Sequence, residues 1–67
     1  MNKVIEITDR TDPAAITALV TFGETVKTRA GRIEPTPEAF LLFVEGRRAR
    51  KFLTAAPAVR ALRRVSR

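Results

Sequence analysis

Neither cysteine nor histidine occurs in this chain of 67 residues, so two common ways of stabilising a small protein are missing. Without cysteine there is no disulfide framework and no thiolate metal site, and without histidine the other usual zinc ligand is lacking. A domain of this size buries only about 60% of its unfolded surface on folding. We therefore expect one small domain, residues 1–67, that holds no metal or cofactor and gains stability by forming a homo-oligomer.

Charge is divided unevenly along the chain. Residues 1–45 carry five basic and seven acidic side chains, a balance of −2, whereas residues 46–67 carry eight basic side chains and no acid, a balance of +8. Arginine outnumbers lysine ten to three, and a guanidinium group suits bidentate contact with phosphate or carboxylate. Such an excess attracts polyanions, although a solvated basic surface has the same composition.

The longest apolar run, residues 39–44, is far shorter than the ~20 residues that span a bilayer. The N-terminal segment reaches Glu6 before any long apolar run, so we expect no secretory signal and a cytoplasmic protein. A basic C-terminal helix on an anionic membrane would offer only a narrow apolar face, formed by Val59, Leu62 and Val65. We therefore expect no membrane partner.

The first half of the chain allows two interpretations. Residues 4–8 are β-branched and predict a short strand. Asp12 before Pro13 is a good N-cap and first helical position, which favours a helix over residues 14–22 with Ile16, Leu19 and Val20 inside. Residues 16–28 are instead dense in β-branched and aromatic side chains, which favours a strand followed by a hairpin turn at residues 23–24. We leave residues 12–22 open between helix and strand.

The second half predicts another hairpin. The apolar run Phe40–Val44 is followed by residues 45–46 as a turn and by a basic strand over residues 47–53, and residues 35–37 separate the two hairpins. Phe40, Leu42 and Val44 would point to one face and Leu41 and Phe43 to the other. This strand is therefore buried on both faces, or one face is used for assembly.

A helical alternative remains. Thr36 would be an N-cap, Pro37 the first helical residue, and residues 40–53 a helix, which would make the protein a small all-α bundle. Pro57 predicts a break, and residues 59–65 form either a last strand or a short basic helix.

From residue 18 to residue 65, the order of strands and glycine turns resembles the small five-stranded SH3-like barrels, with the Sm-like branch, including Hfq-type and WYL-type barrels, closest in spacing. Gly31, Arg32 and Ile33, followed by Phe40, Leu42 and Val44, keep the spacing of the first Sm motif, and residues 50–53 running into residues 59–62 are similar to the end of a WYL domain. The resemblance implies a mainly β fold, a five-stranded barrel with a short N-terminal strand or helix, and a possible ring.

The nucleotide pocket of Sm rings is not matched. Pro37 stands where that motif has an acid, Leu41 where it has asparagine, and Thr54 and Ala55 where the second motif has arginine and glycine. The resemblance therefore does not imply uridine recognition.

The side chains that catalysis usually needs are absent. There is no histidine, cysteine or tyrosine, and the one serine is Ser66. Glu34 and Glu38 are expected to be exposed loop charges, and the three glycines form no phosphate-binding loop. We expect no catalytic residues and no enzyme.

Phosphate contact needs a basic track, and this chain supplies one. We expect Lys27 and Arg29 to lie on a strand beside the basic hairpin arm and to join it in nucleic-acid binding. The full predicted set is Lys27, Arg29, Arg47, Arg48, Arg50, Lys51, Arg60, Arg63 and Arg64. Asparagine occurs once and glutamine not at all, so RNA or DNA would be bound through its backbone with little base readout.

The apolar strand Phe40–Val44 is the predicted oligomer interface, through Phe40, Leu41, Leu42, Phe43 and Val44. A second hypothesis makes the protein a small regulator or inhibitor that docks on an acidic surface of a protein partner. The lack of base-reading amides and the apolar segment favour it.

Overall fold

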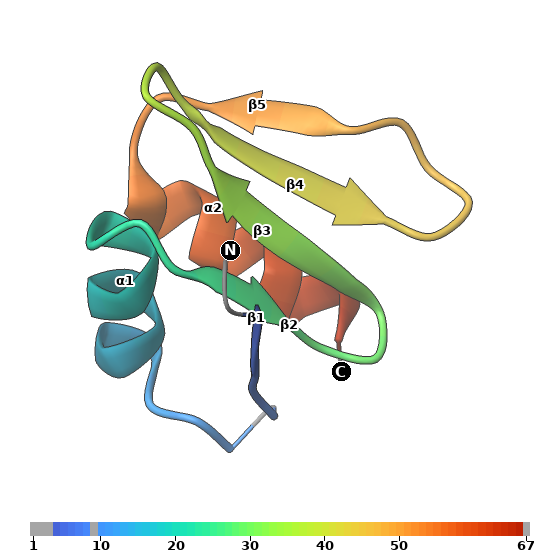
Figure 1. The fold of residues 1–67 in the computed structure, drawn as a ribbon. Coiled ribbons are helices and arrows are strands. Elements are labelled where there is room, and N and C mark those ends of the chain that lie inside the picture. Colours follow the sequence, from blue (N-terminus) through green and yellow to red (C-terminus); the bar gives the residue numbers. More distant parts are fainter. Residues whose placement is uncertain (1–3, 9, 67) are drawn as a thin grey trace.

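A computed structural model of the chain describes residues 4–8 and 10–66. The elements, in chain order, are β1 (Val4–Glu6), α1 (Pro13–Thr21), β2 (Thr25–Lys27), β3 (Gly31–Pro35), β4 (Phe40–Val44), β5 (Arg50–Phe52) and α2 (Ala55–Val65). The strands form one sheet in the order β1-β2-β3-β4-β5, in which β1 pairs parallel to β2 and the other pairs are antiparallel. Both helices lie on one face of this sheet (Figure 1).

The fold is therefore α/β, and the expected barrel is wrong. In a closed barrel the two edge strands would pair with each other, whereas β1 and β5 lie at opposite edges of an open sheet. The helices, not a second layer of strands, cover the apolar face. The all-α alternative is wrong as well, because residues 40–44 and 50–52 are strands.

Helix α1 resolves the ambiguity at residues 12–22 in favour of the helix. Asp12 accepts a hydrogen bond from the Ala14 N–H at 3.0 Å and Pro13 is the first helical residue. The strand-like threonines are accommodated because the hydroxyls of Thr17 and Thr21 donate to carbonyls one turn back, at 2.9 and 2.7 Å. Ile16 and Val20 are fully buried, as the helical interpretation expects.

Gly23 ends this helix and does not turn a hairpin. Its φ of 93° is left-handed, its N–H donates to Val20 at 3.0 Å, and the Glu24 N–H donates to Leu19 at 3.0 Å. This is the Schellman pattern of a helix C-terminus. A positive φ is needed both here and in tight hairpin turns, which is why the glycine alone did not distinguish them.

The segment around Thr36 is a turn between β3 and β4, not a helix start. The Thr36 hydroxyl accepts the N–H of Ala39 at 2.9 Å and donates to its carbonyl at 2.8 Å. Thr36 therefore does bind backbone amides as an N-cap would, but the chain then continues as a strand. The predicted pairing of the second hairpin is confirmed, but its second strand is Arg50–Phe52 and not residues 47–53, and the connection is residues 45–49, with Gly46 at φ 78°.

Helix α2 contains Pro57 in its first turn, so the expected break is wrong. The N–H groups of the first turn have no partner within a helix, and a proline there loses no hydrogen bond. Ala58, Val59 and Leu62 are buried against the sheet. Two of the three side chains considered for membrane contact are thus part of the core.

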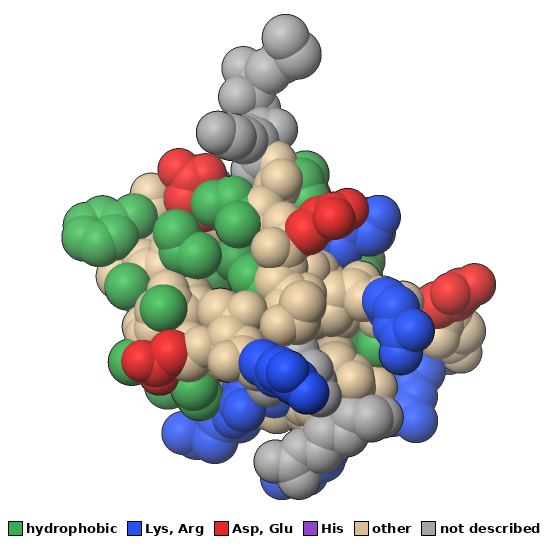
Figure 2. Space-filling view, turned by 90° about the horizontal axis from the view of Figure 1, so that it is seen from below, with side chains coloured by type: hydrophobic (Ala, Val, Ile, Leu, Met, Phe, Trp, Pro, Cys, Tyr) green, Lys and Arg blue, Asp and Glu red, His purple; other side chains and the backbone are tan. Residues whose placement is uncertain are grey.

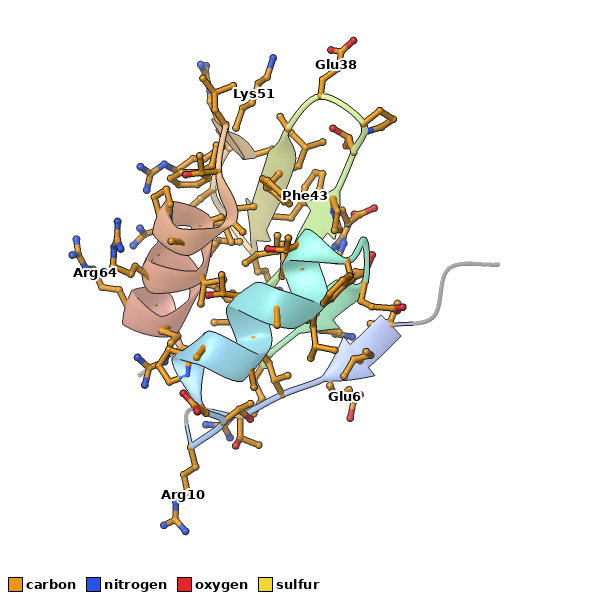
Figure 3. All side chains as sticks on the ribbon, turned by 90° about the vertical axis from the view of Figure 1, so that its left-hand side faces the viewer. Glu6, Arg10, Glu38, Phe43, Lys51 and Arg64 are labelled. Carbon is orange, nitrogen blue, oxygen red and sulfur yellow. The ribbon has the colours of Figure 1, made fainter. Side chains whose placement is uncertain are left out.

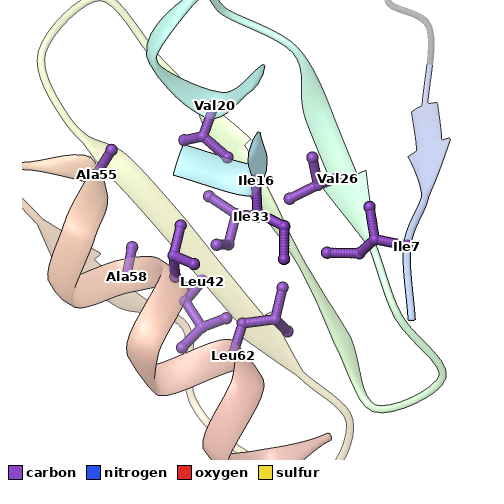
Figure 4. Packing of buried hydrophobic residues seen from close by; sticks show 10 residues of the cluster. Ile7, Ile16, Val20, Val26, Ile33, Leu42, Ala55, Ala58 and Leu62 are labelled. Carbon is purple, nitrogen blue, oxygen red and sulfur yellow. The ribbon is translucent and has the colours of Figure 1, made fainter. Parts of the chain in front are cut away.

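The core lies between the sheet and the two helices (Figure 4). Ile5, Val26, Ile33 and Leu42 are register partners across four strands and face the helices. None of the described helices is long and apolar enough to cross a membrane.

Candidate nucleic-acid interface

Three chain segments meet at one end of the molecule. The Glu45 N–H donates to the Ala30 carbonyl at 3.4 Å, which joins the β4–β5 turn to the β2–β3 turn. The hydroxyls of Thr28 and Ser66 lie 2.7 Å apart, which joins the β2–β3 turn to the C-terminal end of α2. We call this the basic end, because each of the three segments carries two cationic side chains: Lys27, Arg29, Arg47, Arg48, Arg63 and Arg64.

These cations are not neutralised within the described chain. Among residues 4–8 and 10–66, the ion pair found joins Arg32 to Glu34 and involves none of the six. Five of the six are exposed, and Arg63 is partly buried with its Nε lacking a hydrogen-bond partner among the described residues. Viewed from below, Lys and Arg side chains spread over the lower and right-hand parts of the surface, whereas hydrophobic side chains gather at the upper left (Figure 2).

The remaining predicted binding residues lie elsewhere. Arg50 is the register partner of Leu42 and faces the helix side, where its guanidinium lies 4.9 Å from the Phe52 ring centroid. Lys51 is the partner of Leu41 and faces the opposite side. Arg60 is exposed on α2, one turn before Arg64. The sequence-predicted set is thus divided into the basic end and three scattered cations.

Lys27 and Arg29 do not lie on a strand next to the basic hairpin arm, so that prediction is wrong. Lys27 ends β2, which pairs with β1 and β3, while β5 lies beyond β4 at the far edge of the sheet. Arg29 lies in the turn after β2, and Arg47 and Arg48 lie in the connection before β5. These residues approach one another through adjacent turns and not through adjacent strands.

A shallow depression of about 340 Å³ lies beside the basic end. The β2–β3 turn and the facing end of β4 form its walls, with Lys27, Arg29 and Arg32 as cations, Phe43 as the aromatic side chain and Glu45 as the one acid. A second depression of about 470 Å³ lies on the other side of the same turn and shares Lys27 and Arg29 with the first. Lys27 at the end of β2 and Arg29 in the turn after it therefore line both depressions.

The sequence pattern did not identify Arg32 as a binding residue, and it assigned Phe43 to the oligomer interface and not to ligand binding. The two residues are register partners on the sheet face that carries no helix, and the Arg32 guanidinium lies 4.5 Å from the Phe43 ring centroid. Glu34 accepts a hydrogen bond from Arg32 Nε at 2.7 Å. The alternation along β3, with Arg32 and Glu34 on one face and Ile33 on the other, was the available signal.

The apolar strand β4 is only partly available for a subunit contact. Leu42 is 2% exposed, and Phe40 and Val44 pack against the core of their own chain. Leu41 and Phe43 lie on the helix-free face and are partly exposed. An oligomer interface through this strand therefore has two side chains to offer on that face, and assembly remains a prediction.

Comparisons of the chain with protein-family models, with curated proteins and with solved structures found no match. Within the described residues there is also no group of three or more acidic side chains that could hold a metal ion. A function is therefore inferred from the chemistry of the surface.

Proposed function

We propose that this protein binds nucleic acid through the phosphate backbone, with the basic end as the contact surface. The observation that supports the proposal is the meeting of six cations from three segments with no ion pair among them in the described chain. Unpaired arginines in a fixed arrangement suit bidentate contact with phosphate oxygens, and their charge attracts a polyanion over a distance. We infer a cytoplasmic location for this activity.

Salt dependence tests the proposal. If all six side chains contact phosphates, the logarithm of affinity should fall with the logarithm of salt concentration with a slope of about −4 for a single strand and about −5 for a duplex. A fluorescence-anisotropy titration at several salt concentrations measures this slope. Absence of binding to both forms at low ionic strength would overturn the proposal.

Two variants of equal charge locate the surface. The double variant Arg47→Ala/Arg48→Ala removes two cations of the basic end, and Arg50→Ala/Lys51→Ala removes two that lie on β5 away from it. The first should weaken binding and lower the slope by about 1 to 2, since each lost phosphate contact lowers it by about 1. The second should change both values much less. Equal effects would mean that binding follows net charge and not this surface.

Two exposed apolar side chains at the opposite end of the molecule favour a second candidate function, binding to a protein partner. Phe22 is 84% exposed and Leu53 is 78% exposed, and both lie in connections at the ends of the strands away from the basic end. Contiguous exposed apolar surface marks contact sites, and these two side chains are the most exposed large apolar ones of the described chain. A stoichiometric partner that survives nuclease treatment and is lost in Phe22→Ser/Leu53→Ser, yet kept by Arg47→Ala/Arg48→Ala, would support this function.

A further inference from the structure

We propose that Arg32 and Phe43 form a stacking platform for an unpaired base, so that the protein prefers single-stranded over double-stranded nucleic acid. This inference rests on the proposed binding of the phosphate backbone at the neighbouring basic end. It concerns the side of the sheet that carries no helix, where Arg32 and Phe43 are register partners.

The guanidinium group of Arg32 is held from two sides. Its Nε donates to Glu34 at 2.7 Å, and its central carbon lies 4.5 Å from the centre of the Phe43 ring. The Arg32 side chain is nevertheless 47% exposed, so part of this planar group faces solvent. Because Glu34 and Phe43 restrict its orientation before a ligand arrives, less side-chain freedom is lost when a base stacks on it.

The N–H groups of Arg32 that remain free also suit a nucleotide as the ligand. An arginine side chain has five N–H groups, and the bond to Glu34 uses the one on Nε. The other N–H groups make no hydrogen bond to the described residues. They can bind a phosphate or a base edge while the plane of the group supports the ring.

The surroundings of the pair fit one nucleotide flanked by phosphates. Lys27 is the register partner of Arg32 on β2, and both line the depression of about 340 Å³ with Arg29 and Phe43. This volume lies at the lower end of the range of about 300–1,000 Å³ that small-ligand sites occupy. A base seated over Arg32 would bring its own phosphates towards Lys27 and Arg29.

Charge on this face disfavours a duplex. Glu6 pairs in register with Lys27, Glu34 binds Arg32, and Glu45 lines the depression. Acids and bases are thus interspersed, and the dense phosphates of a duplex would meet repulsion as well as attraction. A duplex also keeps the faces of its bases covered by stacking, whereas a single strand can turn one outward.

The test compares a thymidine single strand with an abasic backbone of the same length and charge, by fluorescence anisotropy. One stacked base should make the thymidine strand bind roughly five- to a hundred-fold more tightly than the abasic strand. In Arg32→Lys, which keeps the charge and loses the plane, this ratio should fall towards one. The matched control Arg60→Lys, on the exposed side of α2, should keep the ratio.

The two proposals fail in different ways. Equal binding of both strands to the unaltered protein would overturn the stacking platform and leave the backbone proposal standing. A preference for thymidine that Arg32→Lys and Phe43→Leu both leave intact would place stacking elsewhere and also overturn it. Binding of neither strand at low salt would overturn both. Circular dichroism confirms that each variant is folded.

Discussion

The hydroxyl of Thr28 lies 2.7 Å from the hydroxyl of Ser66, across 38 positions of sequence. The Ser66 hydroxyl also donates to the Leu62 carbonyl at 2.7 Å, and the Thr28 hydroxyl also donates to the Gly31 carbonyl at 3.4 Å. The same Thr28 oxygen accepts the N–H groups of Ala30 and Gly31 at 3.1 and 3.3 Å. One side chain therefore shapes the β2–β3 turn and also holds it to the end of α2.

Replacing Thr28 should lower the stability of the fold. Thr28→Val removes the acceptor of two backbone N–H groups in a partly buried place, and we expect the free energy of unfolding to fall by about 1–3 kcal/mol. Urea denaturation measures this change. Thr21→Ala, which removes an exposed hydroxyl bonded within its own helix, is the control and should cost less. An equal decrease in the free energy of unfolding for both variants would mean that the hydrogen bonds of Thr28 contribute no more to stability than that of an exposed threonine.

Gly31 should not tolerate a side chain. A Cβ at this position would overlap the carbonyl oxygen of Phe43, because β3 and β4 approach closely where Gly31 pairs with Val44. We expect Gly31→Ala to lower the free energy of unfolding by about 1–3 kcal/mol through strain between the strands. Gly46→Asn provides a comparison, since nothing lies within 4 Å of an added Cβ and asparagine tolerates a positive φ. Thermal unfolding in which Gly46→Asn is the more damaging change would contradict this account.

Leu62 and Leu53 allow the stability contributions of a buried and an exposed leucine to be compared. Leu62 is 0% exposed between α2 and the sheet, and Leu53 is 78% exposed. Leu62→Ala should lower the free energy of unfolding by about 2–5 kcal/mol, a large part of the stability of so small a domain. Leu53→Ala should change it by less than about 0.5 kcal/mol. Similar denaturation midpoints for the two variants would mean that α2 does not pack as described.

The one acid of the β4–β5 turn should weaken binding of polyanions. Glu45→Gln removes a negative charge beside the basic end, and we expect single-stranded DNA to bind roughly two- to five-fold more tightly at low salt. Glu38→Gln makes the same chemical change in the exposed β3–β4 turn at the other end of the sheet and is the control (Figure 3). Association rates measured by stopped flow should rise for the first variant and stay constant for the second. An equal rise in both would indicate a response to net charge.

Local signals in the sequence were enough for several elements. The cap formed by Asp12 and Pro13 indicated α1, and the hairpin of β4 and β5 followed from an apolar run, a glycine turn and a basic run. The division of the β4 side chains between two faces was also predicted correctly, because side chains alternate along a strand whatever the fold around it. Each of these features depends on residues within a few positions of one another.

The order of strands and the covering of the sheet were not predictable in this way. A glycine that ends a helix and a glycine that turns a hairpin have the same local requirement, so Gly23 was consistent with a β-rich barrel until α1 was seen to pack on the sheet. The same holds for Pro57, which a helix accepts in its first turn. Pairing between distant segments decides such cases.

The candidate surface shows the same division. Composition alone located the excess of positive charge in the last 22 residues and indicated a polyanionic ligand. The sequence already grouped Lys27 and Arg29 with the basic arm, but only the tertiary structure showed that they meet Arg47, Arg48 and the end of α2 through turns, and that Arg50 and Lys51 lie away from them. It also set Arg32 on Phe43. Charge is a sum over residues and can be counted along a chain, whereas the proximity of side chains depends on how strands pair and helices pack.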